Sequence, residues 1–227
     1  RNYNLPSLND LYWYPNGNED LKPEQSLQTE AGLDYSLKLN NKNLLTVSGS
    51  AYISSVNNWI IWEPGDYIDW HPENIPKVLS RGAELSCQIK GKYRNILYSF
   101  FGEYAVTRTT RNSDSAKISG LSNIQLIYVP MHTANGFLNI STRGYYVNWS
   151  LSFTSSRNTS LNKDKNSPFI LPSYMLNNIS VGKKFMLKKA GFDIRFKIYN
   201  VFNVDYQAVL WRAMPGRNFE ISLNCKI

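Results

Sequence analysis

Three groups of aromatic side chains stand in connecting segments of this chain, and they are the residues best suited to bind a ligand. Flat aromatic faces favour a large, partly apolar molecule. The same residues could instead form an interfacial girdle or pack the loops together. The candidate ligand-binding residues are Tyr12, Trp13 and Tyr14 in the first group, Trp62, Tyr67 and Trp70 in the second, and Tyr206, Trp211 and Arg212 in the third.

Residues for catalysis or for metal binding form no comparable pattern. His71 has Asp66, Asp69 and Glu73 nearby, but the four lack ligand spacing and are more simply interpreted as solvated loop residues. The sequence contains no glycine-rich phosphate loop, no Cys-x-x-Cys pair and no Gly-x-Ser-x-Gly elbow. We therefore predict that the protein is not an enzyme and carries neither a cofactor nor a metal.

The elements that must position the aromatic groups are β-strands. Apolar and polar residues alternate strictly over 27–39, and the same period of two returns in 145–154, 192–199 and 219–227. A strand of about 9 to 11 residues crosses a bilayer, with lipid on its apolar side and a wet lumen on its polar side. The alternation therefore predicts an all-β protein built as an antiparallel transmembrane β-barrel.

The connections between these strands alternate in length. Short turns are expected near residues 41, 92, 143 and 189, and long loops near 15, 68, 114, 162 and 209, including the segments 1–26 and 63–77. Outer-membrane barrels have short periplasmic turns and long extracellular loops, whereas a soluble sandwich does not sort its loops by end. About nine strands are expected between residues 27 and 227. Because bacterial barrels have an even strand number, we expect this chain to be a fragment.

Composition limits the alternatives. Aromatic residues make up 14% of the 227 residues and charged residues 19%, as expected for a chain with a lipid-facing surface. The net charge of +8 is concentrated at the tight turns and forms no basic stripe interleaved with aromatics, which argues against a nucleic-acid partner. The two cysteines, Cys87 and Cys225, are expected to be lipid-facing or packed thiols rather than a disulfide.

Several short motifs follow one another along the chain: Leu5–Trp13, Gly17-Asn18, Leu21–Glu24, Glu30–Leu33, Tyr128–His132, Ile198–Asn203 with Tyr206, and Pro215–Phe219. In this order they resemble landmarks in the C-terminal half of TonB-dependent outer-membrane receptors. The opening motif is most similar to the vitamin B12 receptor branch, particularly in Bacteroides-like bacteria. Ile227 departs from the pattern, since the family usually ends in Phe or Trp.

This resemblance implies a 22-stranded barrel, of which the chain would supply about nine C-terminal strands, with an N-terminal plug domain upstream and absent here. It implies a location in the bacterial outer membrane and import of a large, scarce nutrient such as cobalamin. The implied partners are outer-membrane lipid, the TonB complex acting through the missing N-terminal part, the nutrient ligand and the outer-membrane assembly machinery. Residues 1–26 would be an extracellular loop.

The residues are also compatible with three other functions. The barrel could take a ferric siderophore instead of cobalamin, or it could be a non-transport barrel that binds ligands or mediates adhesion. A soluble β-sandwich is the third alternative, and it would require the apolar rows to be covered by protein. In a barrel, the charged partners of those rows would form a polar lumenal wall, namely Glu30, Asp34, Glu84, Glu103, Asp193 and Arg195.

Overall fold

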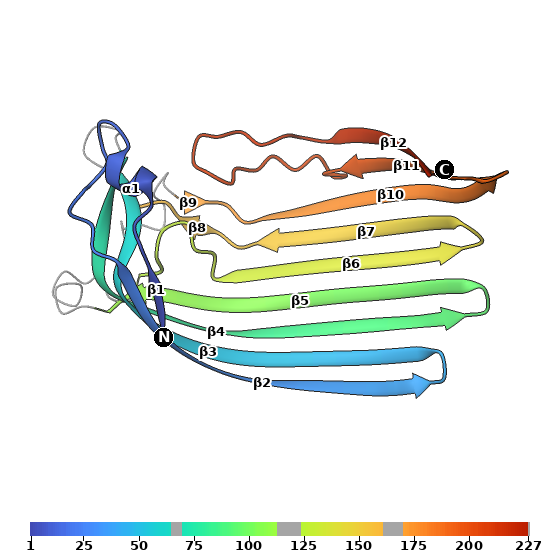
Figure 1. Ribbon diagram of the computed structural model, residues 1–227, viewed down its shortest axis with the longest axis horizontal. Coiled ribbons are helices and arrows are strands. Elements are labelled where there is room, and N and C mark those ends of the chain that lie inside the picture. The colour runs from blue at the N-terminus through green and yellow to red at the C-terminus, as the bar shows by residue number, and fades with distance from the viewer. Residues whose placement is uncertain (65–69, 113–123, 161–169, 227) are drawn as a thin grey trace.

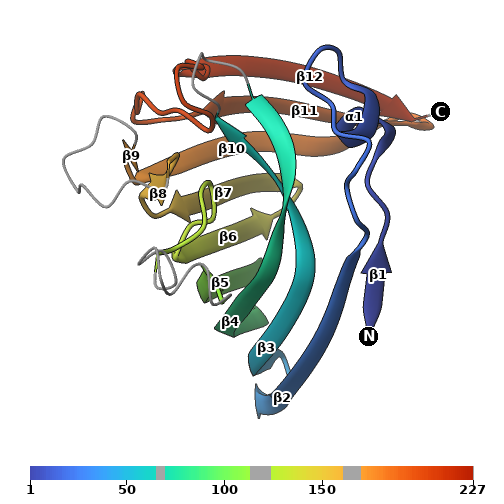
Figure 2. The same cartoon turned by 90° about the vertical axis from the view of Figure 1, so that its left-hand side faces the viewer.

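The structure is a computed structural model that describes residues 1–64, 70–112, 124–160 and 170–226 and consists mainly of one antiparallel sheet (Figure 1). Its strands follow the order β1-β2-β3-β4-β5-β6-β7-β10-β11-β12, and β8 pairs with β9 in a separate ribbon. Figure 2 shows that the large sheet curves into an open trough. The strands are β1 (Asn2–Asn4), β2 (Glu24–Asn40), β3 (Asn43–Pro64), β4 (Trp70–Tyr93), β5 (Ile96–Arg111), β6 (His132–Thr142), β7 (Tyr145–Thr154), β8 (Arg157–Asn158), β9 (Ile170–Leu171), β10 (Tyr174–Leu187), β11 (Ala190–Tyr199) and β12 (Asn218–Lys226).

The connections are sorted by length between the two ends of the sheet. The turns joining β2 to β3, β4 to β5, β6 to β7 and β10 to β11 lie together at one end (Figure 1). The other end carries α1 (Leu8–Tyr12), β1, the β8–β9 ribbon and the connection 200–217. The predicted all-β barrel architecture, with short turns and long loops at opposite ends, is therefore confirmed.

The long strands of the sheet present a mainly apolar row on one face and a mainly polar row on the other. The pairing registers place Tyr35, Val47 and Cys87 side by side on β2, β3 and β4, while their neighbours Asp34, Ser48 and Ser86 share the opposite face. Side chains of the apolar row on β2 are exposed: Leu33 is 85% accessible and Tyr35 is 63% accessible. Large apolar side chains that face outward without a covering layer are what a lipid-facing surface requires.

The expected loop 63–77 is wrong, because most of it is strand. β3 continues to Pro64 and β4 begins at Trp70, so the two strands form a hairpin that extends beyond their neighbours. Pro72 and Pro76 suggested a loop, since proline cannot donate to a ladder. The pairing of β4 with β5 ends at Val78, however, which leaves 70–77 as an edge where proline is tolerated.

Two further boundaries differ from the expectation. Residues 1–26 contain β1, α1 and the first residues of β2, so this segment is partly ordered secondary structure. The uncertain strand expected within 121–142 is shorter and begins at His132. A turn precedes it, and there Leu126 N–H donates to Thr109 O at 2.9 Å. That turn closes a small apolar core, made of Val56, Ile75, Val78 and Leu126, at the long-loop end.

Tyrosine rings cross glycines on the polar face and tie three strands together. Tyr52 on β3 lies over Gly82 on β4, and its hydroxyl is 3.1 Å from the Thr107 hydroxyl on β5. Tyr146 on β7 lies over Gly182 on β10 in the same way and donates to Asp193 on β11 at 2.7 Å. Only a residue without a side chain leaves room for such a ring.

Gly182→Ala is expected to destabilise the sheet. A Cβ at this position would lie 2.3 Å from the Tyr146 ring and 2.7 Å from Ile194 O, so the ring and the backbone must both move, at a cost of about 1 to 3 kcal/mol. The matched control is Gly49→Ala, where the nearest atom is 3.8 Å away. In the folded full-length receptor, the temperature of the heat-induced gel-mobility shift should fall for Gly182→Ala alone. Equal shifts for both variants would contradict this explanation.

The two cysteines are both free thiols, Cys87 being partly buried and Cys225 exposed. This agrees with the expectation of lipid-facing or packed thiols. In the part of the chain that the structure describes, no helix has the length and apolar character needed to span a membrane.

Candidate functional site

The first aromatic group follows a one-turn helix whose start is fixed by its own sequence. Ser7 caps α1: its hydroxyl accepts from Asp10 N–H at 3.1 Å, while Asp10 Oδ2 accepts from Ser7 N–H at 2.8 Å. Such a reciprocal capping box satisfies two backbone donors that a helix start leaves unpaired. Tyr12 therefore ends an ordered turn, and Trp13 and Tyr14 follow it directly.

This N-terminal segment is fastened to the extended β3–β4 hairpin. Trp62 Nε1 on β3 donates to Asp10 Oδ1 at 2.8 Å, which links the first aromatic group to the second. Further along, Asn18 Nδ2 donates to Pro72 O at 3.1 Å, and Asn74 accepts from Lys22 N–H at 2.7 Å. We call residues 5–22 together with 58–64 and 70–76 the aromatic platform.

The platform holds Tyr12, Trp13 and Tyr14 where a ligand can reach them, with exposed fractions of 59%, 56% and 92%. Trp70, at the start of β4, is partly buried, and its ring centroid lies 6.1 Å from that of Tyr128. The structure thus brings two of the three predicted groups together. Tyr67 of the second group lies outside the described residues.

Asp10 gives the platform a pH dependence. Burial acts to raise the pKa of the Asp10 carboxyl, but hydrogen bonds from the Ser7 hydroxyl, Trp62 and Ser7 N–H outweigh it and lower the pKa below the ordinary 3.8. A lowered folded pKa means that the charged carboxylate stabilises docking above pH 3.8 and that this stabilisation is lost as the pH falls below 3.8.

We therefore expect hydrogen exchange at 5–22 in the full-length receptor to accelerate at pH 3 relative to pH 6, after correction for the intrinsic rate. Asp10→Asn should show the faster exchange already at pH 6. An amide has only one oxygen, so it cannot accept hydrogen bonds through two oxygens from both Ser7 N–H and Trp62 Nε1. Asp20→Asn, an exposed change in the same segment, is the control. Unchanged protection in Asp10→Asn would refute the role given to this carboxylate.

Two residues of the third aromatic group line a pocket between the connection 200–217 and residues 170–174, whereas Arg212 is not part of its lining. Tyr206 and Trp211 line a space of about 450 Å³ together with Tyr174 at the start of β10. The rings of Tyr206 and Tyr174 lie 4.8 Å apart. Trp211 is 74% exposed, and Arg212 is exposed and donates its N–H to Val209 O at 3.1 Å.

A buried arginine, Arg157, holds this pocket in position. No local sequence pattern indicates that this arginine has such a role. Arg157 on β8 is 7% exposed, its guanidinium donates to Gln207 O at 2.9 Å and Ala208 O at 3.3 Å, and it lies 5.2 Å from the Tyr174 ring centroid. It therefore joins the β8–β9 ribbon to the loop that carries Tyr206 and Trp211. Buried cations need such partners to offset their lost hydration.

Charged groups brace the base of the platform. Arg111, the last residue of β5, forms an ion pair with Glu63 and lies 4.0 Å from Glu73. Burial, a hydrogen bond with Glu63 and the charge of Glu63 together raise the pKa of the Glu73 carboxyl above its ordinary 4.5. Of the acidic residues near His71 in the sequence, Glu73 is thus paired within the structure, and Asp66 and Asp69 lie outside the described residues.

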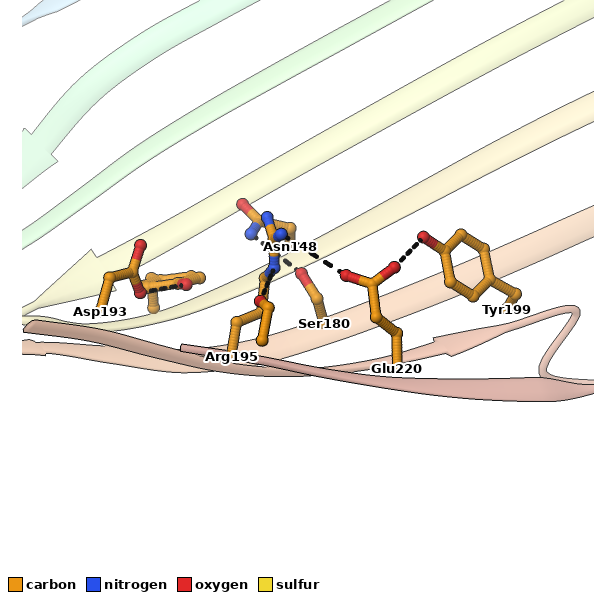
Figure 3. A network of polar contacts seen from close by, with 8 residues as sticks. Asn148, Ser180, Asp193, Arg195, Tyr199 and Glu220 are labelled. Carbon is orange, nitrogen blue, oxygen red and sulfur yellow. Dashed lines mark hydrogen bonds and ion pairs between the residues drawn. The ribbon is translucent and has the colours of Figure 1, made fainter. Parts of the chain in front are cut away.

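The inner wall of the trough carries the polar network that a lumen needs. On β11 and β12, Arg195 lies 3.6 Å from Glu220, which also accepts from the Tyr199 hydroxyl at 2.8 Å (Figure 3). Asp193 accepts from Tyr146 on the same face. On β2 to β5, four of the predicted wall carboxylates line one hollow of about 590 Å³: Glu30, Asp34, Glu84 and Glu103.

Sequence reasoning missed the residues that hold the aromatic groups in position. A Ser-x-x-Asp spacing at Ser7 and Asp10 could have revealed the helix start. Asn74, which joins the two parts of the platform, lay in the segment expected to be a loop. Arg157 and Arg111 bind partners that are far away in the sequence, namely Gln207 and Glu63. No local sequence pattern predicts such pairs.

Comparison with known proteins agrees with this architecture. The family model described as "TonB dependent receptor-like, beta-barrel" matches residues 1–201. Vitamin B12 transporters BtuB are similar to the chain: that of Photobacterium profundum is 35% identical over 88 residues, 37% of this chain and 14% of that protein. That of Vibrio vulnificus strain CMCP6 is 25% identical over 221 residues, 97% of this chain and 32% of that protein.

A solved structure shows the same fold. The ferric-catecholate import receptor Fiu of Escherichia coli K12 superposes with a TM-score of 0.63 at 20% identity, over 90% of this chain and 28% of Fiu. The chain therefore spans a third or less of the length of each of these proteins. Proteins of this family are located in the outer membrane. Because the family model covers most of its length, the chain belongs to the TonB-dependent receptor-like β-barrel family.

Proposed function

We propose that this chain is the C-terminal part of the barrel of an outer-membrane receptor that imports cobalamin with energy delivered through TonB. The remaining strands of a 22-stranded barrel and a plug domain would come from the rest of the receptor, which belongs to the vitamin B12 branch as found in Bacteroides-like bacteria. The observation that carries the proposal is the similarity to two vitamin B12 transporters, one of them along 97% of this chain.

The geometry supports a large ligand at the long-loop end. The aromatic platform exposes three adjacent aromatic side chains, and the pocket at Tyr206 adds a second space, of about 450 Å³, that is lined in part by aromatic rings. A corrinoid is wide and only partly apolar, so several separated aromatic contacts suit it better than one deep cavity does. In this proposal, Tyr12, Trp13, Tyr14, Trp62, Tyr67, Trp70, Tyr206, Trp211 and Arg212 contact the ligand.

The second candidate function is import of a ferric siderophore. The likeness to a ferric-catecholate receptor favours it, although at 20% identity that likeness concerns the fold. Aromatic faces also suit a catecholate chelate, and exposed Arg212 offers a charge for an anionic one. The two functions differ in ligand and share the same transport mechanism.

Binding measurements on the full-length receptor separate the candidates. We expect saturable calorimetric binding of cyanocobalamin and no heat with ferric enterobactin or ferric citrate. Binding of a ferric chelate without cyanocobalamin would establish the siderophore function instead. Absence of binding for all of these ligands, by a receptor that passes the heat-modifiability test for folding, would favour a non-transport barrel.

A further inference from the structure

The short-turn end of the sheet is strongly basic. Three of its four turns have no Asp or Glu within four residues on either side, and the fourth has only Asp193. Cationic side chains that lie close together repel one another unless anions neutralise them. We therefore expect an anionic partner at this end of the sheet. The basic residues at this end are Lys38, Lys42, Lys90, Lys92, Arg94, Arg143, Lys183, Lys184, Lys188, Lys189 and Lys226.

One pocket on this rim gathers three of the cations. It has a volume of about 490 Å³ and lies between the β2–β3 turn and the β4–β5 turn. All seven lining residues are cationic, amide or aromatic, and none is acidic: Asn40, Asn41, Lys42, Asn43, Lys92, Tyr93 and Arg94. We call this space the turn pocket.

Hydrogen bonds around the turn pocket engage two of its three asparagine oxygens, those of Asn40 and Asn43. Asn43 Oδ1 accepts from Lys92 N–H at 3.0 Å and from the Tyr98 hydroxyl at 3.1 Å, and Asn40 Oδ1 accepts from Lys42 N–H at 2.9 Å. Within the described part of the chain, the three side-chain cations have no carboxylate partner. The groups that a ligand meets there therefore include ammonium, guanidinium and amide N–H donors, which together suit a phosphate.

The neighbouring surface adds an apolar component. Leu37 pairs with Leu45, and Leu45 with Ile89, so one row of the outward face runs across β2, β3 and β4 just beyond the pocket. Leu39 and Tyr93 extend this face to the rim, with exposed fractions of 50% and 64%. A free phosphate would use the cations alone, whereas a phosphate attached to acyl chains would use both surfaces.

We propose that the turn pocket binds the headgroup phosphate of an anionic glycerophospholipid in the leaflet at the short-turn end, with its acyl chains along the Leu37–Leu45–Ile89 row. Cations at a membrane surface attract anionic lipids, and the short turns place these residues at headgroup level. The pocket adds a defined position to that general attraction. Its lipid would help to set the depth and tilt of the barrel wall.

The test uses full-length receptor in nanodiscs of phosphatidylcholine with a minor share of phosphatidylglycerol, followed by mass-spectrometric counting of the lipids that stay bound after detergent extraction. We expect phosphatidylglycerol to be retained preferentially. The variant Lys42→Gln/Lys92→Gln/Arg94→Gln should lower that retention by at least about tenfold, since each cation near the surface contributes about one kcal/mol. Lys42→Arg, which keeps the charge, should retain the lipid.

The control variant Arg143→Gln/Lys188→Gln/Lys189→Gln removes three charges from other turns of the same end. We expect it to keep most of the bound phosphatidylglycerol. Equal losses in the two triple variants would overturn the proposal in favour of a diffuse basic rim. Retention by the turn-pocket variant, or displacement of the lipid by millimolar inorganic phosphate, would overturn it as well. Heat-modifiable gel mobility verifies that each variant is folded.

Discussion

Trp13→Ala is expected to weaken binding of cyanocobalamin to the full-length receptor by at least about tenfold. Tryptophan is enriched among the binding-surface residues whose truncation costs about 2 kcal/mol or more. Trp13 is 56% exposed and follows a helix that Asp10 and Trp62 hold against the hairpin. Isothermal titration calorimetry gives the dissociation constant directly.

The matched control for this substitution is Tyr3→Ala, which removes an aromatic side chain that is 61% exposed on β1. We expect its dissociation constant to stay within about twofold of that of the unaltered receptor. If Trp13→Ala and Tyr3→Ala bind equally well, the aromatic platform does not contact the ligand. The binding surface would then have to be sought at the Tyr206 pocket.

Arg111→Met is expected to loosen the extended β3–β4 hairpin at neutral pH. Without the guanidinium, Glu63 and Glu73 repel each other across a partly buried site, and breaking such a pair costs about 2 kcal/mol when some solvent reaches it. That cost corresponds to about thirtyfold faster amide exchange. Hydrogen exchange of residues 58–64 and 70–76, followed by mass spectrometry, measures the effect.

The pH dependence of this variant has a definite sign. Because the folded-state pKa of Glu73 is raised, protonation relieves the repulsion: stability is highest below pH 4.5 and is lost as the pH rises through the folded pKa. Arg111→Met should therefore recover protection on acidification toward pH 4.5, and adding Glu73→Gln should restore it at neutral pH. Arg108→Met, an exposed change on the same strand, is the control. No rescue by Glu73→Gln would contradict the electrostatic explanation.

The strands themselves could be predicted because each carries its own pattern. In residues Leu27 to Leu39, successive side chains point to opposite faces of the strand, and one of those faces has apolar surroundings. This alternation depends only on the segment itself, so it can be recognised in the sequence. The β3–β4 hairpin could not be predicted in this way. Its prolines indicated a loop, and what makes them tolerable is the early end of β5, a fact about a neighbour in space.

The candidate site shows the same division between local and distant causes. The aromatic candidates could be identified from residue type alone. The structure joins the first two groups through the hydrogen bond from Trp62 to Asp10. The residues that position them, such as Asn74 and Arg157, pair across more than fifty residues of sequence. No local period encodes contacts of that range, so the supports could be found only in the folded chain.

We infer that the apolar rows of the sheet face hydrocarbon while the polar rows face a water-filled bore. Spin labels placed one at a time along residues 46–52 of β3 in the reconstituted full-length receptor can measure this orientation, by the accessibility of each label to oxygen and to a water-soluble nickel chelate. We predict that oxygen accessibility is high at Val47, Gly49 and Ala51, and that nickel accessibility is high at Ser48 and Ser50. Low accessibility to both reagents along one face would contradict this orientation, because it would mean that a second protein layer covers those rows.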